Sequence, residues 1–295
     1  PFLYVVLTGQ HKEMVEQVID LFNIDVDADM KLMRDQQSLS TLTSNSLCSI
    51  EKDFKCHMPQ LILVQGDTTT AFTAALAAFY QKIPIAHVEA GLRTNDIFEP
   101  YPEEANRRLI SQLASIHFAP TQQAKENLLH EGNKAPIYVT GNTIIDSLLH
   151  ISSTKPKLNI KGLSLKNKRL ILATVHRREN WGQRIQGIAK GLKTIVDKHQ
   201  DLVLLLPMHL NPIVRDNLIN ILEDHPRIFL TEPLNYSELV AAIKQSEFIL
   251  TDSGGIQEEA PSLGKQVLVL RDTTERPEGI KAGTSRLIGT NPEDI

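Results

Sequence analysis

Carboxylate side chains recur where apolar runs of this sequence end. Asp67 follows "LILVQG", Glu89 follows "IPIAHV", and Glu103 opens the segment "EEANRR". Each has a simple structural explanation when taken singly, because acidic residues often cap a helix or occupy its first turn. Three carboxylates at one edge of a protein would instead have to share protons or pair with arginine, as acids and bases do in active sites. Acid–base catalysis and helix capping are therefore competing interpretations.

A different kind of site follows the apolar run "EFIL", where Ser253, Gly254 and Gly255 precede "IQEEA". In a strand–turn–helix, the unpaired N–H groups of the first helical turn bind anions, and glycine lets a diphosphate approach the backbone closely. The alternative is an ordinary turn with Ser253 as the N-cap of the helix. Glu258 and Glu259 follow about one turn into the helix, where a carboxylate can accept hydrogen bonds from a ribose diol; the alternative is a pair of solvated helix charges. The two carboxylates shift the balance towards a nucleotide site.

Basic and imidazole side chains also occur at strand ends in this half of the chain. Arg276 could bind a phosphate through a fork of charge-assisted hydrogen bonds, or pair with an acidic neighbour such as Glu275. His176 and Arg177 follow "LILATV", and His209 follows "VLLLPM". A lone histidine at a strand end is usually structural, but two that face a phosphate turn are harder to explain in that way. A metal site is not favoured, because no third ligand has suitable spacing.

Short apolar runs alternate with helix-length amphipathic stretches from end to end. Residues 68–82 and 102–114 carry apolar side chains at helical spacing, and the runs between such helices predict strands of a parallel sheet buried on both faces. The polar, lysine-rich residues 152–169 predict a linker. We therefore expect an α/β fold with two doubly wound, Rossmann-like domains, residues 1–155 and 156–295.

Ligands of such sheets bind beyond the carboxyl ends of the strands, where nearly all the unusual polar residues of this chain occur. We therefore expect the active site in a cleft between the two domains. The acidic residues would come from the first domain and the glycine turn from the second.

The bulk composition excludes several other classes of protein. The chain has 295 residues and a net charge of -4, without the basic patch typical of nucleic-acid binding. Cys48 and Cys56 are too few for a disulfide framework or a zinc site. No apolar run approaches the ~18 residues of a membrane span and no secretory leader is visible, so we expect a cytoplasmic protein. The sequence begins within a strand and has the character of an excerpt from a longer chain.

Five segments carry a resemblance to a known family: "GDTTT", "HVEAGLRT", "PEEANRR", "HRREN" and "LTDSGGIQEEAPSLGKQVLVLRDTTERPE". They resemble the non-hydrolysing bacterial UDP-N-acetylglucosamine 2-epimerases, over essentially the whole chain. The resemblance implies two Rossmann-like domains of the glycosyltransferase-B type, a homodimer, and interconversion of UDP-GlcNAc and UDP-ManNAc with no metal or nicotinamide cofactor. It also implies that a first strand with its loop and a terminal helix are missing from the sequence.

The resemblance implies a role for each candidate residue. Family members carry out an anti-elimination of UDP to give 2-acetamidoglucal and add UDP back after a proton returns to the other face of C2, which requires a base and an acid. The residues that match the catalytic positions are Asp67, Glu89, Glu103 and His176, with base and acid unassigned among the carboxylates. Those that match the UDP site are Ser253, Gly254, Gly255, Glu259 and Arg276. Those that match an activating second UDP-GlcNAc site are Gln10, His11, Gln37, Arg177 and His209.

Two other functions stay open on the sequence alone. One is a glycosyltransferase that uses the same nucleotide turn, since a fold does not determine its chemistry. The other is a catalytically inactive regulator that binds UDP-GlcNAc. The set of three carboxylates argues against a pure binding protein, because carboxylates beside a diphosphate do not improve its binding.

Overall fold

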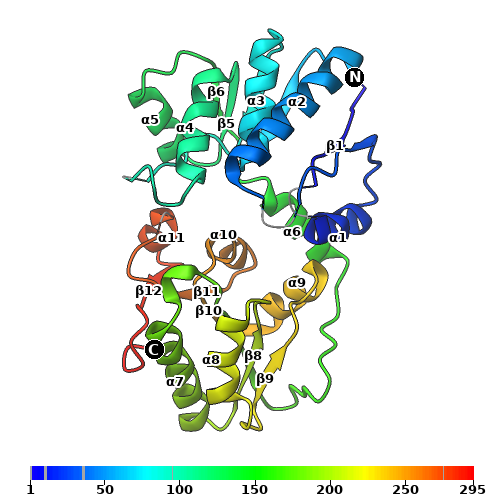
Figure 1. Cartoon of the computed structure of the whole chain (residues 1–295). Helices are drawn as coiled ribbons and strands as arrows, with labels where there is room; N and C mark the ends of the chain where they lie inside the picture. The colour runs from blue at the N-terminus through cyan, green and yellow to red at the C-terminus, as the bar shows by residue number, and fades with distance from the viewer. Residues whose placement is uncertain (1, 10–11, 35–36, 95, 275) are drawn as a thin grey trace. The chain divides into compact units, whose positions relative to one another are not determined.

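The chain forms two compact α/β units, Pro1–Thr143 (unit 1) and Ile144–Ile295 (unit 2) (Figure 1). The computed structural model describes residues 2–9, 12–34, 37–94, 96–274 and 276–295. All strand pairs in both units are parallel within these ranges, which confirms the predicted fold class. None of the helices in this part of the chain combines the length and apolar character needed to cross a membrane.

Unit 1 contains a four-stranded sheet and a separate two-stranded sheet. The larger sheet has the strand order β3 (Ile62–Gln65), β4 (Ile85–Val88), β5 (Ile116–Ala119) and β6 (Ile137–Val139), and the smaller pairs β1 (Val6–Leu7) with β2 (Ala28–Asp29). The helices are α1 (Lys12–Phe22), α2 (Leu39–His57), α3 (Thr69–Tyr80), α4 (Glu103–Leu113) and α5 (Gln122–His130).

The core of unit 1 depends on the small side chains of α3. Ala75, Ala77 and Ala78 have no exposed surface, so α3 packs closely between α2 and the sheet. Helix α4 contacts both α3 and β4. The two helices therefore begin beside the strand ends that carry the acidic residues of unit 1.

Unit 2 is built on a six-stranded parallel sheet with the order β12-β11-β10-β7-β8-β9. Relative to the first strand of the sheet, this is the doubly wound order 6-5-4-1-2-3, whose switch point lies between β7 and β10. The strands are β7 (Arg169–Thr174), β8 (Leu202–Pro207), β9 (Ile228–Thr231), β10 (Ser246–Thr251), β11 (Gln266–Val269) and β12 (Ser285–Leu287).

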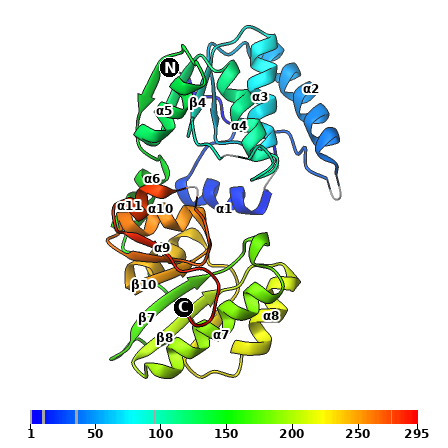
Figure 2. The same ribbon diagram turned by 90° about the vertical axis from the view of Figure 1, so that its left-hand side faces the viewer.

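Helices cover both faces of this sheet (Figures 1 and 2). The helices of unit 2 are α6 (Ile144–Ser153), α7 (Gln183–Lys198), α8 (Pro212–Leu222), α9 (Tyr236–Gln245), α10 (Gly254–Ser262) and α11 (Pro277–Lys281), with a short 3-10 turn at Arg178–Asn180. Alternate residues of β7 enter different apolar clusters: Leu170 and Leu172 pack with α9 and α10, and Ile171 and Ala173 pack with α7 and α8.

The division between the units falls between Thr143 and Ile144, before α6, whereas the sequence pattern placed a domain boundary between residues 155 and 156. Helix α6 contacts α9 and α10, and its Leu148 and Ile151 are buried. Four residues of the expected linker pack against the apolar cluster that Leu170 and Leu172 form with α9 and α10: Leu158, Ile160, Leu163 and Leu165. The linker is polar in overall composition, but these apolar residues at every second or third position attach it to unit 2.

Candidate active site

Asp67 lies in the turn between β3 and α3, and two residues of α4 hold it in place. Arg107 Nη2 donates to Asp67 Oδ2, and Asn106 Nδ2 donates to the backbone oxygen of Asp67 at 2.9 Å. The N-cap of α3 is Thr68, whose hydroxyl accepts from the amide of Ala71. Because the capping role belongs to Thr68, the carboxylate of Asp67 is left for the pair with Arg107.

Glu89 lies beside this turn because β3 and β4 are neighbours in register, with Gln65 opposite Val88. Its backbone has the left-handed φ of 65°, uncommon for a residue with a long side chain and typical of functional sites. A Cβ at Gly66, which itself has φ 69°, would lie 3.4 Å from Glu89 Oε2. The Glu89 carboxylate is therefore adjacent to the residue that precedes Asp67.

The acidic pair at the start of α4 divides into a structural and an available carboxylate. Glu104 is fully buried and accepts hydrogen bonds from the amide of Thr94 at 3.1 Å and from Arg108 Nε at 2.7 Å, and it lies 3.3 Å from Arg107 Nη1. Glu103 is half-buried, and its side chain forms no hydrogen bond or ion pair within the described residues. Glu103 and Arg107 are one turn apart on the same helix face. Helix α4 thus carries Glu103 and also holds Asp67.

Asp252 of unit 2, between β10 and the glycine turn, organises the start of the loop after β7. It has no exposed surface and accepts hydrogen bonds from the amides of His176 and Arg177 at 2.9–3.0 Å and from Asn180 Nδ2 at 2.9 Å. Burial opposes ionisation, but His176, the Arg177 amide and Asn180 together hold the pKa of Asp252 below its ordinary value. The fold therefore keeps a buried carboxylate at the switch point of the sheet.

His176 is oriented by this carboxylate. Its Nδ1 lies 3.1 Å from Asp252 Oδ1, so the proton on Nδ1 is engaged and Nε2 is the nitrogen left to meet a ligand. The side chain is 39% exposed, which is enough for such a contact. The sequence identified His176 as a candidate but not Asp252, although Asp252 immediately precedes the Ser-Gly-Gly turn.

The glycine turn starts α10, with Ser253 at the N-cap position. Its hydroxyl makes no capping hydrogen bond, so the first-turn amides of α10 have no side-chain cap. Strand pairing places Thr251 opposite Thr174, so this turn and the His176 loop leave the sheet side by side. Uncapped amides beside an oriented histidine form an arrangement suited to an anion.

Glu259 follows on the inner side of α10. Burial raises its pKa to about 7, and nearby Glu258 acts in the same direction, while the hydrogen bond from Tyr236 opposes the shift. The Tyr236 hydroxyl donates to Glu259 Oε2 at 3.0 Å, and Oε1 lies 3.5 Å from the position of a Cβ on Gly255. Glu259 therefore presents one carboxylate oxygen next to the glycine turn.

Arg276 pairs with Glu258, its Nε donating to Glu258 Oε1 at 2.6 Å. The guanidinium is thus attached to the same helix that starts with the glycine turn. A ligand phosphate would compete with Glu258 for this arginine. From the sequence, the expected ion-pair partners of Arg276 were acidic residues close to it in the chain. The observed partner, Glu258, instead lies 18 positions before it.

The residues assigned to an activating site fall in both units. In unit 2, His209 stacks near His176, with 6.2 Å between ring centroids, and the amide of Arg177 binds Asp252. Burial and the neighbouring His176 lower the pKa of His209. In unit 1, Gln37 accepts from the amide of Arg34 at 3.1 Å. Gln10 and His11 lie outside the described residues.

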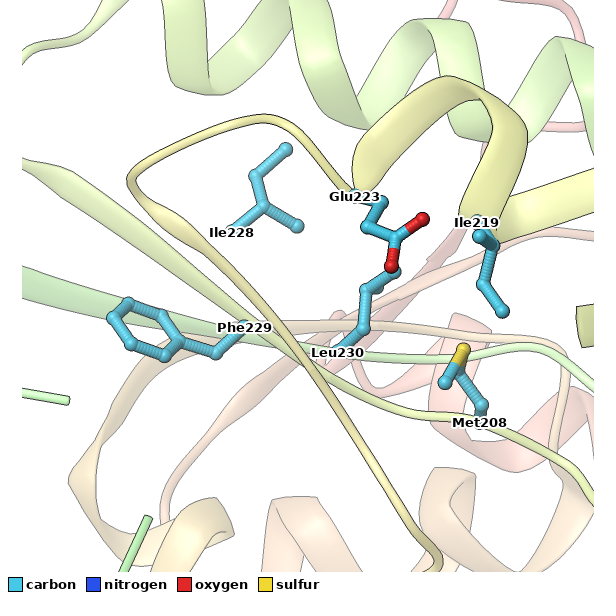
Figure 3. A pocket seen from close by; sticks show the side chains of 6 residues that line it. All are labelled: Met208, Ile219, Glu223, Ile228, Phe229 and Leu230. Atoms are coloured by element: carbon cyan, nitrogen blue, oxygen red, sulfur yellow. The ribbon is translucent and has the colours of Figure 1, made fainter. Parts of the chain in front are cut away.

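A cavity of about 290 Å³ in unit 2 does not coincide with any of these residues (Figure 3). The only charged side chain among the residues that line it is Glu223, whose carboxylate would repel a diphosphate. The lining residues are Met208, Ile219, Glu223, Ile228, Phe229 and Leu230. This cavity is therefore no candidate for a nucleotide. Across the described ranges, no three His, Cys, Asp or Glu side chains are grouped so as to hold a metal ion.

The family of this chain follows from its match to a known family model. The model described as UDP-N-acetylglucosamine 2-epimerase matches residues 2–295. The chain belongs to the UDP-N-acetylglucosamine 2-epimerase family. Among curated family members, the epimerase of Bacillus subtilis (strain 168) is 48% identical over 296 residues, which cover 99% of this chain and 77% of the relative.

Solved epimerase structures have the same fold. The epimerase of Neisseria meningitidis, solved bound to UDP-GlcNAc, has a TM-score of 0.91 and 45% identity, covering 99% of this chain and 81% of that one. The S. aureus MnaA structure with UDP has a TM-score of 0.89 and 47% identity, covering 98% and 77%. These epimerases confirm the predicted class of two Rossmann-like domains of the glycosyltransferase-B type.

Proposed function

We propose that this chain is a UDP-N-acetylglucosamine 2-epimerase, an isomerase that interconverts UDP-GlcNAc and UDP-ManNAc. The observation that carries the proposal is the placement of the group of carboxylates in unit 1: Arg107 and Asn106 of α4, the helix that begins at Glu103, hold Asp67, and the Glu89 carboxylate lies next to Gly66. A protein that only binds a nucleotide sugar gains nothing from such a group. Curated family members with more than 45% identity are named for the same activity.

The reaction proceeds in this proposal by elimination and re-addition. The proton on C2 of the sugar is not next to a carbonyl group, so its direct removal is very slow. One carboxylate among Asp67, Glu89 and Glu103 takes this proton while the bond from C1 to the UDP oxygen breaks, which gives 2-acetamidoglucal and UDP. Another carboxylate then returns a proton to the opposite face of C2, and UDP attacks C1.

Unit 2 supplies the UDP site in the same proposal. The uncapped amides of Gly254 and Gly255 and the hydroxyl of Ser253 bind phosphate oxygens, and His176 stabilises the charge of the departing diphosphate through Nε2. Arg276 contributes positive charge after exchange with Glu258. Glu259 accepts hydrogen bonds from the ribose hydroxyls. His209 and Arg177, which lie beside His176, bind a second UDP-GlcNAc in this proposal, as the family resemblance implies.

An isotope experiment distinguishes this function from the two alternatives. The protein is incubated with UDP-GlcNAc in deuterium oxide, and C2 of the sugar is followed by proton NMR. Formation of UDP-ManNAc with deuterium at C2 is the expected result. Binding with neither exchange nor epimerisation would contradict the proposal and favour a regulator, and transfer of the sugar to an added acceptor would favour a glycosyltransferase.

The assembly and the location of the protein stay predictions. The family resemblance implies a homodimer, measurable by sedimentation, and the cytoplasmic location is the expectation from the sequence pattern.

A further inference from the structure

The buried histidine His87 lies on β4, two residues before Glu89, and binds the turn that carries Asp67. It has no exposed surface, and its Nε2 donates to the backbone oxygen of Gly66 at 2.8 Å. Its Nδ1 has no hydrogen-bond partner among the described residues. Burial lowers the pKa of His87 to about 4, and the charges of Arg93 and Arg107 act in the same direction. The ring is therefore neutral near pH 7 and carries its proton on Nε2.

Gly66 is held on both sides by consecutive residues of β4. Its amide donates to the backbone oxygen of Val88 at 3.0 Å, and its own oxygen accepts from His87. The φ of 69° turns the chain sharply at this point, and Asp67 follows directly. With the Glu89 carboxylate also beside Gly66, the end of β4 controls where Asp67 lies relative to Glu89.

We propose that His87 is a positioning residue for the epimerisation: its hydrogen bond to Gly66 sets the turn that presents Asp67 beside Glu89. The inference rests on the function proposed above. Proton transfer at C2 requires carboxylates at defined distances from the sugar, and a displacement of about 1 Å can lower a rate by about a hundredfold. His87 acts through Gly66 and does not touch the substrate. Asn106 and Arg107 hold Asp67 from the side of α4, and His87 adds a side-chain hydrogen bond from the sheet to the backbone bond between Gly66 and Val88.

The chain provides a matched control in His117. This histidine of β5 is the register partner of His87, is also fully buried, and its ring centroid lies 6.3 Å from that of His87. Within the described part of the chain, no hydrogen bond joins it to Gly66 or Asp67. Replacing His117 by leucine therefore makes a similar packing change on the neighbouring strand but keeps the hydrogen bond from His87 to Gly66.

The test compares His87→Leu, His87→Gln and His117→Leu in the full chain. Leucine removes the donor, whereas the glutamine amide can donate to Gly66 from a similar distance. We expect kcat to fall about a hundredfold in His87→Leu, with the Kd of UDP, which unit 2 binds, changed by less than about threefold. His87→Gln should recover at least about tenfold of this loss, and His117→Leu should keep kcat within about threefold of wild type. Melting temperatures report the packing loss common to both leucine variants.

Equal losses of kcat in His87→Leu and His117→Leu would overturn the inference, because packing alone would then explain them. Full activity of His87→Leu would overturn it as well. Nitrogen NMR of the ring provides a readout that does not depend on activity: the neutral Nε2-protonated form is expected, and a ring protonated on Nδ1 would contradict the geometry. A wild-type protein without epimerase activity would refute the proposed function, while this tautomer and the response of the Gly66 amide signal to His87→Leu would still test the contact.

Discussion

The two units assemble their candidate residues in opposite ways. In unit 2, the residues proposed to bind UDP come mainly from one strand–turn–helix, Thr251 to Glu259, so the local chain places most of them. In unit 1, each carboxylate comes from a separate element, and Asp67 is held by residues of α4 about 40 positions away. A nucleotide can be bound by a single turn, whereas acid–base chemistry at one carbon requires groups from several directions.

This difference has a consequence for mutagenesis. Substitutions in unit 1 should affect chemistry more than binding, and those in unit 2 should affect binding and local stability.

Asp67→Asn should lower kcat by about 10³-fold or more, because the amide cannot accept or return the proton at C2. The Kd of UDP should change by only a few-fold. Steady-state kinetics and calorimetric titration with UDP measure the two quantities. A large loss of UDP binding would show that Asp67 has a structural role and would remove the contrast between the units.

Asp252→Asn should destabilise unit 2 by about 2–3 kcal/mol, because the buried carboxylate accepts several hydrogen bonds and contacts His176. The pKa of Asp252 is below its ordinary value in the folded state, so its stabilisation is present above about pH 4 and is lost as the pH falls through the folded pKa. Denaturant unfolding followed from pH 3 to 7 should show a smaller acid-induced loss in the variant. The same pH dependence in both proteins would contradict this prediction.

Glu259 should couple UDP binding to release of a proton. Its pKa is about 7 because burial favours the neutral form of the carboxyl group in the free protein. This neutral form contributes to the stability of the folded state below the ordinary pKa of glutamate, and the contribution is lost as the pH rises through about 7. Ribose hydroxyls that donate to the carboxylate favour the charged form, so UDP affinity should rise about tenfold from pH 6 to pH 8.

Glu259→Gln is the matched control for this titration, because the protonation of UDP itself is common to both proteins. The variant should bind UDP more weakly and without the part of the pH dependence that Glu259 contributes. Calorimetry in buffers of different ionisation enthalpy counts the released proton. Identical profiles for the two proteins would refute the coupling.

The smallest effects distinguish the two helix starts. Thr68→Ala removes a capping hydrogen bond of α3 and should cost about 1 kcal/mol of stability in unit 1. Ser253→Ala removes a hydroxyl that caps nothing, so the stability of unit 2 should change by less than about 0.5 kcal/mol while UDP binds more weakly. A stability loss at Ser253 as large as that at Thr68 would favour the ordinary-turn interpretation of the glycine motif.

Most of the structure that depends on residues close together in the chain could be predicted from the sequence. Helices expected at residues 68–82 and 102–114 occur at Thr69–Tyr80 and Glu103–Leu113, and the strand–turn–helix at Ser253 was expected from its composition. Apolar periodicity and glycine determine such features within a few residues of the chain. The short strand β5, with buried His117 in a four-residue segment, gave too little signal to be recognised.

The contacts that orient the site could not be predicted in the same way. Asp252 binds the amide of His176 across 76 positions, and Arg107 reaches Asp67 across 40. Such pairs depend on which strands and helices become neighbours, which one sequence does not specify. Only the location of Asp252, between a strand and a glycine turn, was visible in advance.

Helix α6 determines how unit 2 can be produced by itself. A fragment that starts at residue 156, where composition alone suggests a cut, would lose Leu148 and Ile151 and leave α9 and α10 with an uncovered apolar surface. A fragment that starts at Ile144 keeps this surface covered. The fragment that starts at Ile144 is therefore the one to use for UDP-binding studies on isolated unit 2. The same starting point suits isotope labelling for spectroscopy and domain exchange with a related enzyme.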